Sequence, residues 1–286
     1  MKMKLSYFAE LVKLRLSLLA TFAAASGYVA ARHPQGFSFS FILMVTGSFL
    51  IGGGANAMNQ WVESGHDSVM LRTRDRVIPR GAMSSRSVFF CAAIFSIAGF
   101  GLLCGVNPTA ALLGVFMWVA YVFVYTPLKR VSPLNVIAGS VCGAVPPLIG
   151  WFGSGNHFSF PAFLIFFQLL VWQIPHFAAI AWKYREDYSR ASFKMPFLQD
   201  SFKLREKLFV VISAAMYLLS TSMFFQENLC GGIMWYLSLI VAVLFMINTF
   251  FFINHPQKKT AQTAVTLSII SLSCSYIGLW IHALLL

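Results

Sequence analysis

The sequence predicts an all-α membrane protein in which about nine transmembrane helices form a single bundle. Of its 286 residues, 58% are hydrophobic and only 10% are charged, whereas soluble domains carry roughly 25% charged residues. The mean hydropathy is +0.73, and the apolar residues fall into runs of about the 20 residues that a helix needs to cross a bilayer. Basic residues concentrate in alternate loops, as in membrane proteins. This composition excludes a soluble enzyme, a disordered chain and a fibrous repeat.

Nine apolar runs are predicted to span the membrane, and together they make one domain, 1–286. The third and fourth runs are separated only by Asn107 and Pro108, which is the turn chemistry of a tight helical hairpin. In chain order, the predicted spans are approximately 16–32, 38–58, 87–106, 109–126, 134–152, 159–182, 207–226, 232–253 and 262–285.

The distribution of charge places the N-terminus on the cytoplasmic side. Every second loop is basic, and basic residues also precede the first span. An odd number of crossings then puts the C-terminus on the opposite side. The two longest cytoplasmic loops, 59–86 and 183–206, are expected to cap a cavity that faces the cytoplasm. The residues before the first span that carry this signal are Lys2, Lys4, Lys13 and Arg15.

Charge and cysteine usage limit the classes of partner. The net charge of +12 is explained by the cytoplasmic loops, so the expected partner is a lipid bilayer rather than nucleic acid. The five cysteines are scattered singly and are interpreted as packed apolar residues. Lys13 and Arg15 interrupt the first apolar stretch, which does not resemble a signal or transit peptide. The sequence therefore favours a bacterial plasma (inner) membrane.

The first polar cluster of interest follows the second span. In a helix, the spacing of Asn59, Glu63 and Asp67 puts three oxygen ligands on one face. Such ligands suit Mg²⁺, which takes one or two carboxylates and completes its shell with water and substrate phosphate. The cluster therefore indicates a phosphate-bearing substrate. The alternative is that acidic residues simply belong in the loops of a membrane protein.

A basic segment comes directly after this cluster. Arginine guanidinium groups bind phosphate oxygens through paired hydrogen bonds, so a diphosphate held between metal and arginines is the expected ligand. The positive-inside rule explains any single one of these arginines equally well. The segment contains Arg72, Arg74, Arg76 and Arg80.

The second long loop again mixes acids with cations, and the two loops are expected to close over one diphosphate. Arg185 and Asp187 lie in this cluster. Its acids have an alternative explanation as exposed ion pairs without function.

His176 lies inside the predicted sixth span, where an ionisable residue is a functional candidate that can bind iron or accept a proton. A packed, hydrogen-bonded histidine is the competing interpretation.

Four segments resemble the UbiA-type intramembrane prenyltransferases. Asn59 to Gly81 is similar to the family's Asn-x-x-x-Asp-x-x-x-Asp signature with its trailing arginines, and Leu11 to Tyr28 is similar to its first helix. Tyr125 to Trp151 and Trp172 to Met195 resemble the branch of the family that acts on haem.

The resemblance implies a reaction and its participants. Farnesyl diphosphate would donate its chain to a vinyl group of haem B, and water would add to give haem O and diphosphate. The cofactor would be Mg²⁺. A haem A synthase or a terminal oxidase assembly would be the protein partners.

The resemblance also implies roles for particular residues. Asn59, Glu63 and Asp67 would hold Mg²⁺ on the diphosphate, and Asp187 would serve a second metal or position the first. His176 would bind or orient the haem. The residues expected to bind diphosphate are Arg72, Arg76, Arg80, Lys129, Arg130 and Arg185, and the pair Lys129 and Arg130 has a haem propionate as its alternative partner.

Two other functions remain open at this point. An enzyme of the same fold could prenylate an aromatic or quinone precursor instead of haem, and its diphosphate loops would look the same. A transporter or a non-catalytic haem-binding protein is the second alternative. Its coupling sites should lie deep in the spans, whereas the carboxylates here lie at one interface.

Overall fold

The computed structural model describes residues 5–31 and 37–285, and every regular element in them is helical. The predicted charges Lys2 and Lys4 lie outside the described residues. In chain order, the elements are α1 (Leu5–Leu11), α2 (Leu14–Ala30), α3 (Phe39–Asp67), α4 (Ser85–Cys104), α5 (Pro108–Val119), the π-helix η1 (Ala120–Tyr125), α6 (Thr126–Val131), α7 (Asn135–Ala144), α8 (Pro146–Gly153), α9 (Phe160–Lys183), α10 (Arg185–Arg190), α11 (Leu204–Gln226), α12 (Gly232–Asn254) and α13 (Lys258–Leu285).

Eight helical stretches in the described residues are long and apolar enough to cross a membrane. Two of these stretches are composite, because α5, η1 and α6 form one span (Pro108–Val131) and α7 and α8 form another (Asn135–Gly153). The shorter apolar helix α2 corresponds to the first predicted span. The prediction of an all-α membrane protein with about nine spanning helices is therefore confirmed.

The predicted start of the first long loop is wrong, and the second long loop contains an unpredicted helix. The first long loop was expected to begin at residue 59, but α3 continues to Asp67 and the loop begins at residue 68. The polar side chains between 59 and 67 do not end the helix because they lie against other polar groups inside the bundle. The second loop, expected to be 183–206, contains the short helix α10.

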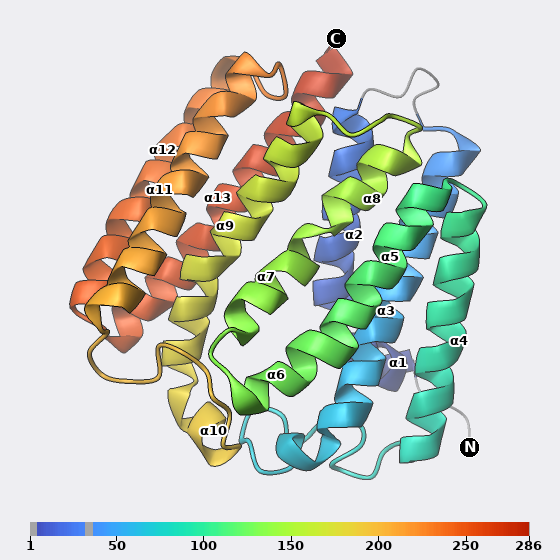
Figure 1. The fold of residues 1–286 in the computed structure, drawn as a ribbon, viewed down its shortest axis with the longest axis vertical. Helices are drawn as coiled ribbons and strands as arrows, with labels where there is room; N and C mark the ends of the chain where they lie inside the picture. The colour runs from blue at the N-terminus through green and yellow to red at the C-terminus, as the bar shows by residue number, and fades with distance from the viewer. Residues whose placement is uncertain (1–4, 32–36, 286) are drawn as a thin grey trace.

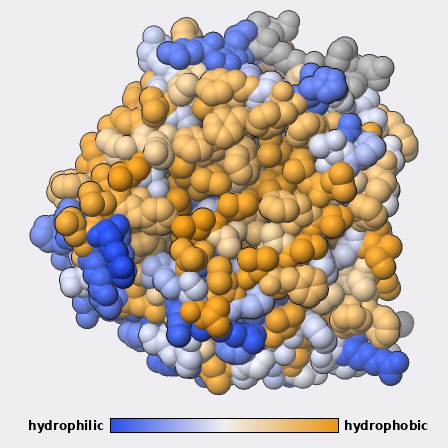
Figure 2. Space-filling view, viewed as in Figure 1, coloured by the Kyte–Doolittle hydropathy of each residue, from blue (hydrophilic) through white to orange (hydrophobic). Residues whose placement is uncertain are grey.

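The helices run side by side in one bundle, with α1, α10 and the end of α6 at one end and the C-terminal end of α13 at the other (Figure 1). Figure 2 shows that apolar residues cover the middle of the visible face, while hydrophilic residues gather mainly toward its rims. This distribution matches a helical bundle that is surrounded by lipid.

Helices α2 and α8 cross in backbone contact, which requires small residues. A Cβ on Gly27 would overlap the carbonyl oxygen of Pro147, and a Cβ on Gly150 would overlap that of Ala24. Close packing at small residues is a general source of stability for helices in membranes. The crossing fixes α2 in the bundle and so helps to place Lys13, directly before α2, against α3.

Candidate functional site

The three predicted ligands on α3 lie on one buried face of the helix. Asn59, Glu63 and Asp67 are exposed by only 1%, 3% and 0%, and all three belong to one continuous helix. Buried polar groups in a low-dielectric interior must be paired. The identity of their partners therefore defines the site.

Each of the three ligands faces a different cation. Lys13 Nζ donates to Asn59 Oδ1 at 2.9 Å, and Lys129 Nζ donates to Glu63 Oε1 at 2.9 Å. The guanidinium of Arg76 completes the set, because its Nη1 lies 2.8 Å from one carboxylate oxygen of Asp67 and 2.7 Å from the other. Three oxygen-bearing side chains on α3 therefore face three cations. The cations come from three separate segments of the chain.

Lys13 is a site residue that the sequence reasoning treated only as a topology signal. It adopts a left-handed backbone conformation with φ of 48° at the break between α1 and α2, a conformation that surrounding contacts must hold. Burial, with the nearby charges of Arg76 and Lys129, lowers the pKa of its ammonium group to about 7. The signal that could have revealed it is a cation that interrupts the first apolar run, as Arg15 also does.

The π-helix η1 and the helix α6 that follows it present a second face with the same spacing. Tyr121, Tyr125 and Lys129 follow one another at four-residue intervals, as do the ligands on α3, and this repeat was overlooked in the sequence. The two tyrosine rings stack with centroids 5.3 Å apart, and Lys129 Nζ lies 4.5 Å from the ring centroid of Tyr125. Short π-helical segments are frequent at functional sites. Here η1 supplies the aromatic rings, and Lys129 on α6 directs its ammonium group at Glu63 on α3.

Thr126 fixes the orientation of the Asn59 amide. Asn59 Nδ2 donates to Thr126 Oγ1 at 3.0 Å, and the threonine hydroxyl in turn donates to the backbone oxygen of Tyr121 at 2.8 Å. With its amide nitrogen held in this way, Asn59 must turn its Oδ1 toward Lys13. Thr126 was also missed, since nothing in the sequence pairs it with a residue 67 positions away.

Asp187 joins the two long loops, as their predicted closure requires. Its carboxylate accepts hydrogen bonds from the backbone nitrogens of Leu71 at 3.0 Å and Arg72 at 3.2 Å. Arg190 Nη1 also donates to it, at 3.3 Å. The carboxylate therefore holds the second loop against the first, and its predicted role as a metal ligand stays a prediction.

The predicted diphosphate-binding cations differ in their placement. Arg76 and Lys129 lie in the cluster, and Arg130 borders it by donating to the backbone oxygen of Val62 at 3.3 Å. The guanidinium of Arg72 lies over the ring of Tyr184 at 5.1 Å. The remaining two are engaged elsewhere: Arg80 pairs with Glu10 at 2.8 Å, and Arg185 pairs with Asp200 at 3.5 Å.

His176 lies apart from this cluster, against α13. Its Nδ1 is 2.7 Å from the hydroxyl of Ser268, and its ring stacks on Trp172 with centroids 4.6 Å apart. Because the Ser268 hydroxyl donates its hydrogen to Val265 O at 2.7 Å, we assign the imidazole proton to Nδ1. This tautomer leaves a lone pair on Nε2, as a metal-binding histidine requires.

The donor set on α3 fits Mg²⁺. Within residues 5–31 and 37–285, no group of three or more His, Cys, Asp or Glu side chains is placed to hold a metal ion. The site instead offers two carboxylates and one amide oxygen. Magnesium commonly binds one or two carboxylates and leaves its other positions to water and substrate phosphates.

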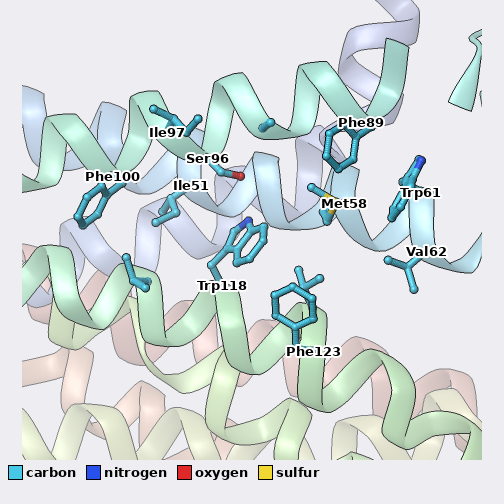
Figure 3. A pocket seen from close by; sticks show the side chains of 13 residues that line it. Ile51, Met58, Trp61, Val62, Phe89, Ser96, Ile97, Phe100, Trp118 and Phe123 are labelled. Carbon is cyan, nitrogen blue, oxygen red and sulfur yellow. The ribbon is translucent and has the colours of Figure 1, made fainter. Parts of the chain in front are cut away.

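An apolar groove of about 580 Å³ lies on the neighbouring face of α3. In Figure 3, Trp118 and Phe123 extend from the fourth span toward Met58 and Trp61, and the residues of α4 form the opposite wall. Met58 and Val62 line the groove and directly precede Asn59 and Glu63 in the sequence. The helix therefore presents hydrocarbon-binding and charge-binding surfaces side by side.

Comparisons with known proteins give the context of this site. The profile of the UbiA prenyltransferase family matches residues 18–273. A protoheme IX farnesyltransferase from Opitutus terrae is 37% identical over 241 residues, which are 84% of this chain and 80% of the relative. A protein of the same description from Flavobacterium psychrophilum is 31% identical over 278 residues, 95% of this chain and 91% of the relative.

A solved structure shares the fold at low sequence identity. It is a UbiA homologue from Archaeoglobus fulgidus bound to DMAPP and Mg²⁺, with a TM-score of 0.67 and 13% identity over 95% of this chain and 98% of that chain. At this identity the likeness supports the fold alone.

Proposed function

Because this chain belongs to the UbiA prenyltransferase family, we propose that it transfers the farnesyl group of farnesyl diphosphate to a vinyl group of haem B. Water adds in the same reaction, and the products are haem O and diphosphate. The near-full-length relatives described as protoheme IX farnesyltransferase support this acceptor. The observation that carries the proposal is the buried row of oxygen donors on α3 opposed by three cations and bordered by an apolar groove.

Asn59, Glu63 and Asp67 are the residues that would hold Mg²⁺. The ion, when bound, neutralises charge on the diphosphate and so makes it a better leaving group. Support comes from the donor chemistry of α3, which offers two carboxylates and one amide oxygen on one buried face.

The cations of the site stabilise the leaving group. Lys13, Arg76 and Lys129 stand opposite the ligand face, so their hydrogen-bond donors are already placed where diphosphate oxygens gather charge as the allylic C–O bond breaks. Donors held in position before the reaction contribute most in such sites. Arg72 and Arg130 lie at the rim and serve the entry of the diphosphate. Arg80 and Arg185 are paired with Glu10 and Asp200, so each would bind the diphosphate only after its ion pair separates.

The apolar groove takes the farnesyl chain. It adjoins the polar cluster along α3, and Ser96 is the only hydroxyl-bearing residue among the side chains that line it. Burial of a hydrocarbon chain in such a groove supplies binding energy that does not depend on the diphosphate.

His176 holds the haem by its iron. The support is the Nε2 lone pair, which the hydrogen bonds of Ser268 leave available, and the Trp172 ring stacked on the imidazole.

The chain works in a membrane as a multi-pass protein, and its bacterial relatives favour the plasma (inner) membrane. A haem A synthase or a terminal oxidase assembly is the protein partner that this product suits.

Diphosphate release by the purified protein tests the acceptor. The protein in detergent is given farnesyl diphosphate and Mg²⁺ together with haem B or, separately, with an aromatic carboxylic acid or a quinone precursor. We expect release that requires haem B. Release that requires an aromatic acceptor instead would identify a different member of the family. No release with any acceptor would favour a non-catalytic or transport protein.

A further inference from the structure

A second, smaller cavity lies under the loop that carries α10. Its volume is about 70 Å³, and its walls come from α7, α9, α10 and the C-terminal residue of η1. The lining is mainly apolar, but three polar side chains contribute to it: Tyr125, Asn135 and Tyr188. A farnesyl chain or a porphyrin is far too large for this space.

Asn135 is held in one orientation and leaves an acceptor unused. The residue is 0% exposed, and its Nδ2 donates to the backbone oxygens of Ser132 at 2.6 Å and Lys194 at 3.1 Å. Both amide hydrogens are therefore engaged, and the side chain cannot turn over. Its Oδ1 is buried without a hydrogen-bond partner among the described residues, although a buried acceptor of this kind normally has one.

The cavity has the size and polarity to hold water. A water molecule needs about 10–15 Å³ of such volume and two to four polar partners. The Asn135 carbonyl and the hydroxyls of Tyr125 and Tyr188 supply three groups, and neither hydroxyl is hydrogen-bonded to a side chain or backbone group in the described part of the chain. Water in this cavity would satisfy all three.

Tyr125 connects this cavity with the diphosphate site. Its ring lines the cavity and also faces Lys129 Nζ at 4.5 Å, while Lys129 itself donates to Glu63 at 2.9 Å. One aromatic ring thus lies between this cavity and the charged cluster. The proposed reaction needs a water close to the site of the leaving group.

We propose that this cavity stores the water that adds to the prenylated haem, with Asn135 Oδ1 and the Tyr125 and Tyr188 hydroxyls as its hydrogen-bond partners. This inference rests on the proposed function. The terminal vinyl carbon bonds to the allylic carbon of the farnesyl chain as the C–O bond to diphosphate breaks, and a cation forms on the carbon attached to the porphyrin ring. The oxygen of the stored water bonds to that carbon. The proton released from the water passes to the departing diphosphate.

The same cation has a second fate when no water is held. It loses a proton from the adjacent carbon to the diphosphate and becomes an alkene, lighter than haem O by the mass of one water. The ratio of the two products therefore reports on the stored water, whereas a purely structural defect lowers both products together.

The experiment is mass spectrometry of the haem products made by the purified protein from haem B, farnesyl diphosphate and Mg²⁺. The variants are Asn135→Leu, Tyr125→Phe and Tyr188→Phe, and the two Tyr→Phe changes retain the rings and their packing. Matched controls outside the cavity are Asn248→Leu, which alters a half-buried Asn whose Oδ1 is likewise buried and unpartnered, and Tyr236→Phe on the exposed surface of α12.

We expect the wild type and both controls to give haem O almost exclusively. The cavity variants should shift the product toward the alkene by about tenfold or more, and this result in the Tyr→Phe variants suffices if Asn135→Leu does not fold. An unchanged ratio in the folded cavity variants would overturn the water site while leaving the proposed function intact. Absence of any prenylated haem from the wild type would overturn the proposed function and this inference with it.

Discussion

At the scale of single residues, the Glu63–Lys129 ion pair links stability to the proposed activity. Both side chains are buried and lie 2.9 Å apart, so removal of one partner leaves an uncompensated charge in a low-dielectric interior. Such a loss costs about 3–5 kcal/mol, whereas removal of both partners is often neutral. The pair is therefore expected to matter for stability as well as for binding.

Replacing Lys129 alone, and then together with Glu63, separates the role in stability from the role in activity. We predict that Lys129→Met lowers the thermal stability of the detergent-solubilised protein by the equivalent of about 3–5 kcal/mol and abolishes prenyl transfer. The double variant Glu63→Gln with Lys129→Met should recover most of the stability and stay inactive. Thermal unfolding followed by circular dichroism measures the first effect. A single variant as stable as the wild type would contradict the pairing.

Thr126 is predicted to act on metal binding through Asn59. Thr126→Val removes the acceptor for Asn59 Nδ2 and frees the amide to turn, at a cost of about 1 kcal/mol for one hydrogen bond. We expect the Mg²⁺ concentration for half-maximal activity to rise about fivefold. Thr126→Ser, which retains the hydroxyl, is the control and should behave like the wild type. An equal loss in both variants would mean that Thr126 acts only through packing.

At the scale of elements, α3 carries two functions on adjacent faces, and the groove beside it can be tested independently of the metal ligands. Ala93 on α4 lines the groove, so Ala93→Trp is predicted to raise the KM for farnesyl diphosphate by about tenfold. The KM for the much shorter dimethylallyl diphosphate should change little. These constants come from diphosphate release at varied substrate concentration.

Ala98 on the same helix provides the matched control. It is exposed and does not line the groove, so Ala98→Trp should leave both KM values unchanged. If Ala93→Trp also left the KM for farnesyl diphosphate unchanged, the groove would be a site for a bilayer lipid and not for the substrate chain.

The link between the two cytoplasmic loops is a second prediction at this scale. Asp187→Asn removes a charge that accepts two backbone N–H groups, and hydrogen bonds to charged groups contribute about 1.5–3 kcal/mol each. We expect trypsin to cleave the segment 68–84 several-fold faster in this variant. Asp200→Asn is the control, because its carboxylate is 89% exposed and pairs only loosely with Arg185. Equal cleavage of the two variants would remove Asp187 from the loop contact.

The sequence predicted the ligand face of α3 because residues spaced four apart lie on the same face of any helix, whatever packs against it. It could not predict the partners of that face, since Lys13 and Lys129 approach from segments 46 and 66 residues away. The loop boundary at residue 59 was misplaced for the same reason. A polar stretch after an apolar run is normally assigned to a loop. Only the cations that pair with these side chains show that the stretch is a buried part of the helix.

For the whole molecule, nine apolar runs and their alternating charges were sufficient to predict the helical bundle, because hydrocarbon thickness limits helix length. The breaks within two spans were not predicted. One is the π-helix η1 in the fourth span, and the other separates α7 from α8 at Val145 and Pro146. Tyr121 and Tyr125 lie in the first of these breaks, and Tyr121 and the following Lys129 contact α3 at Asn56 and Glu63.

The most direct test of the proposed activity is mass spectrometry of the haems extracted from cells that express this chain, in a host that lacks its own haem farnesylation. The wild-type chain should yield a haem with a hydroxyethylfarnesyl side chain. The Asn59→Ala variant, expressed at the same level in the membrane, should yield only haem B. Wild-type cells that contain the protein but no farnesylated haem, or a variant that makes as much of it as the wild type, would contradict the account.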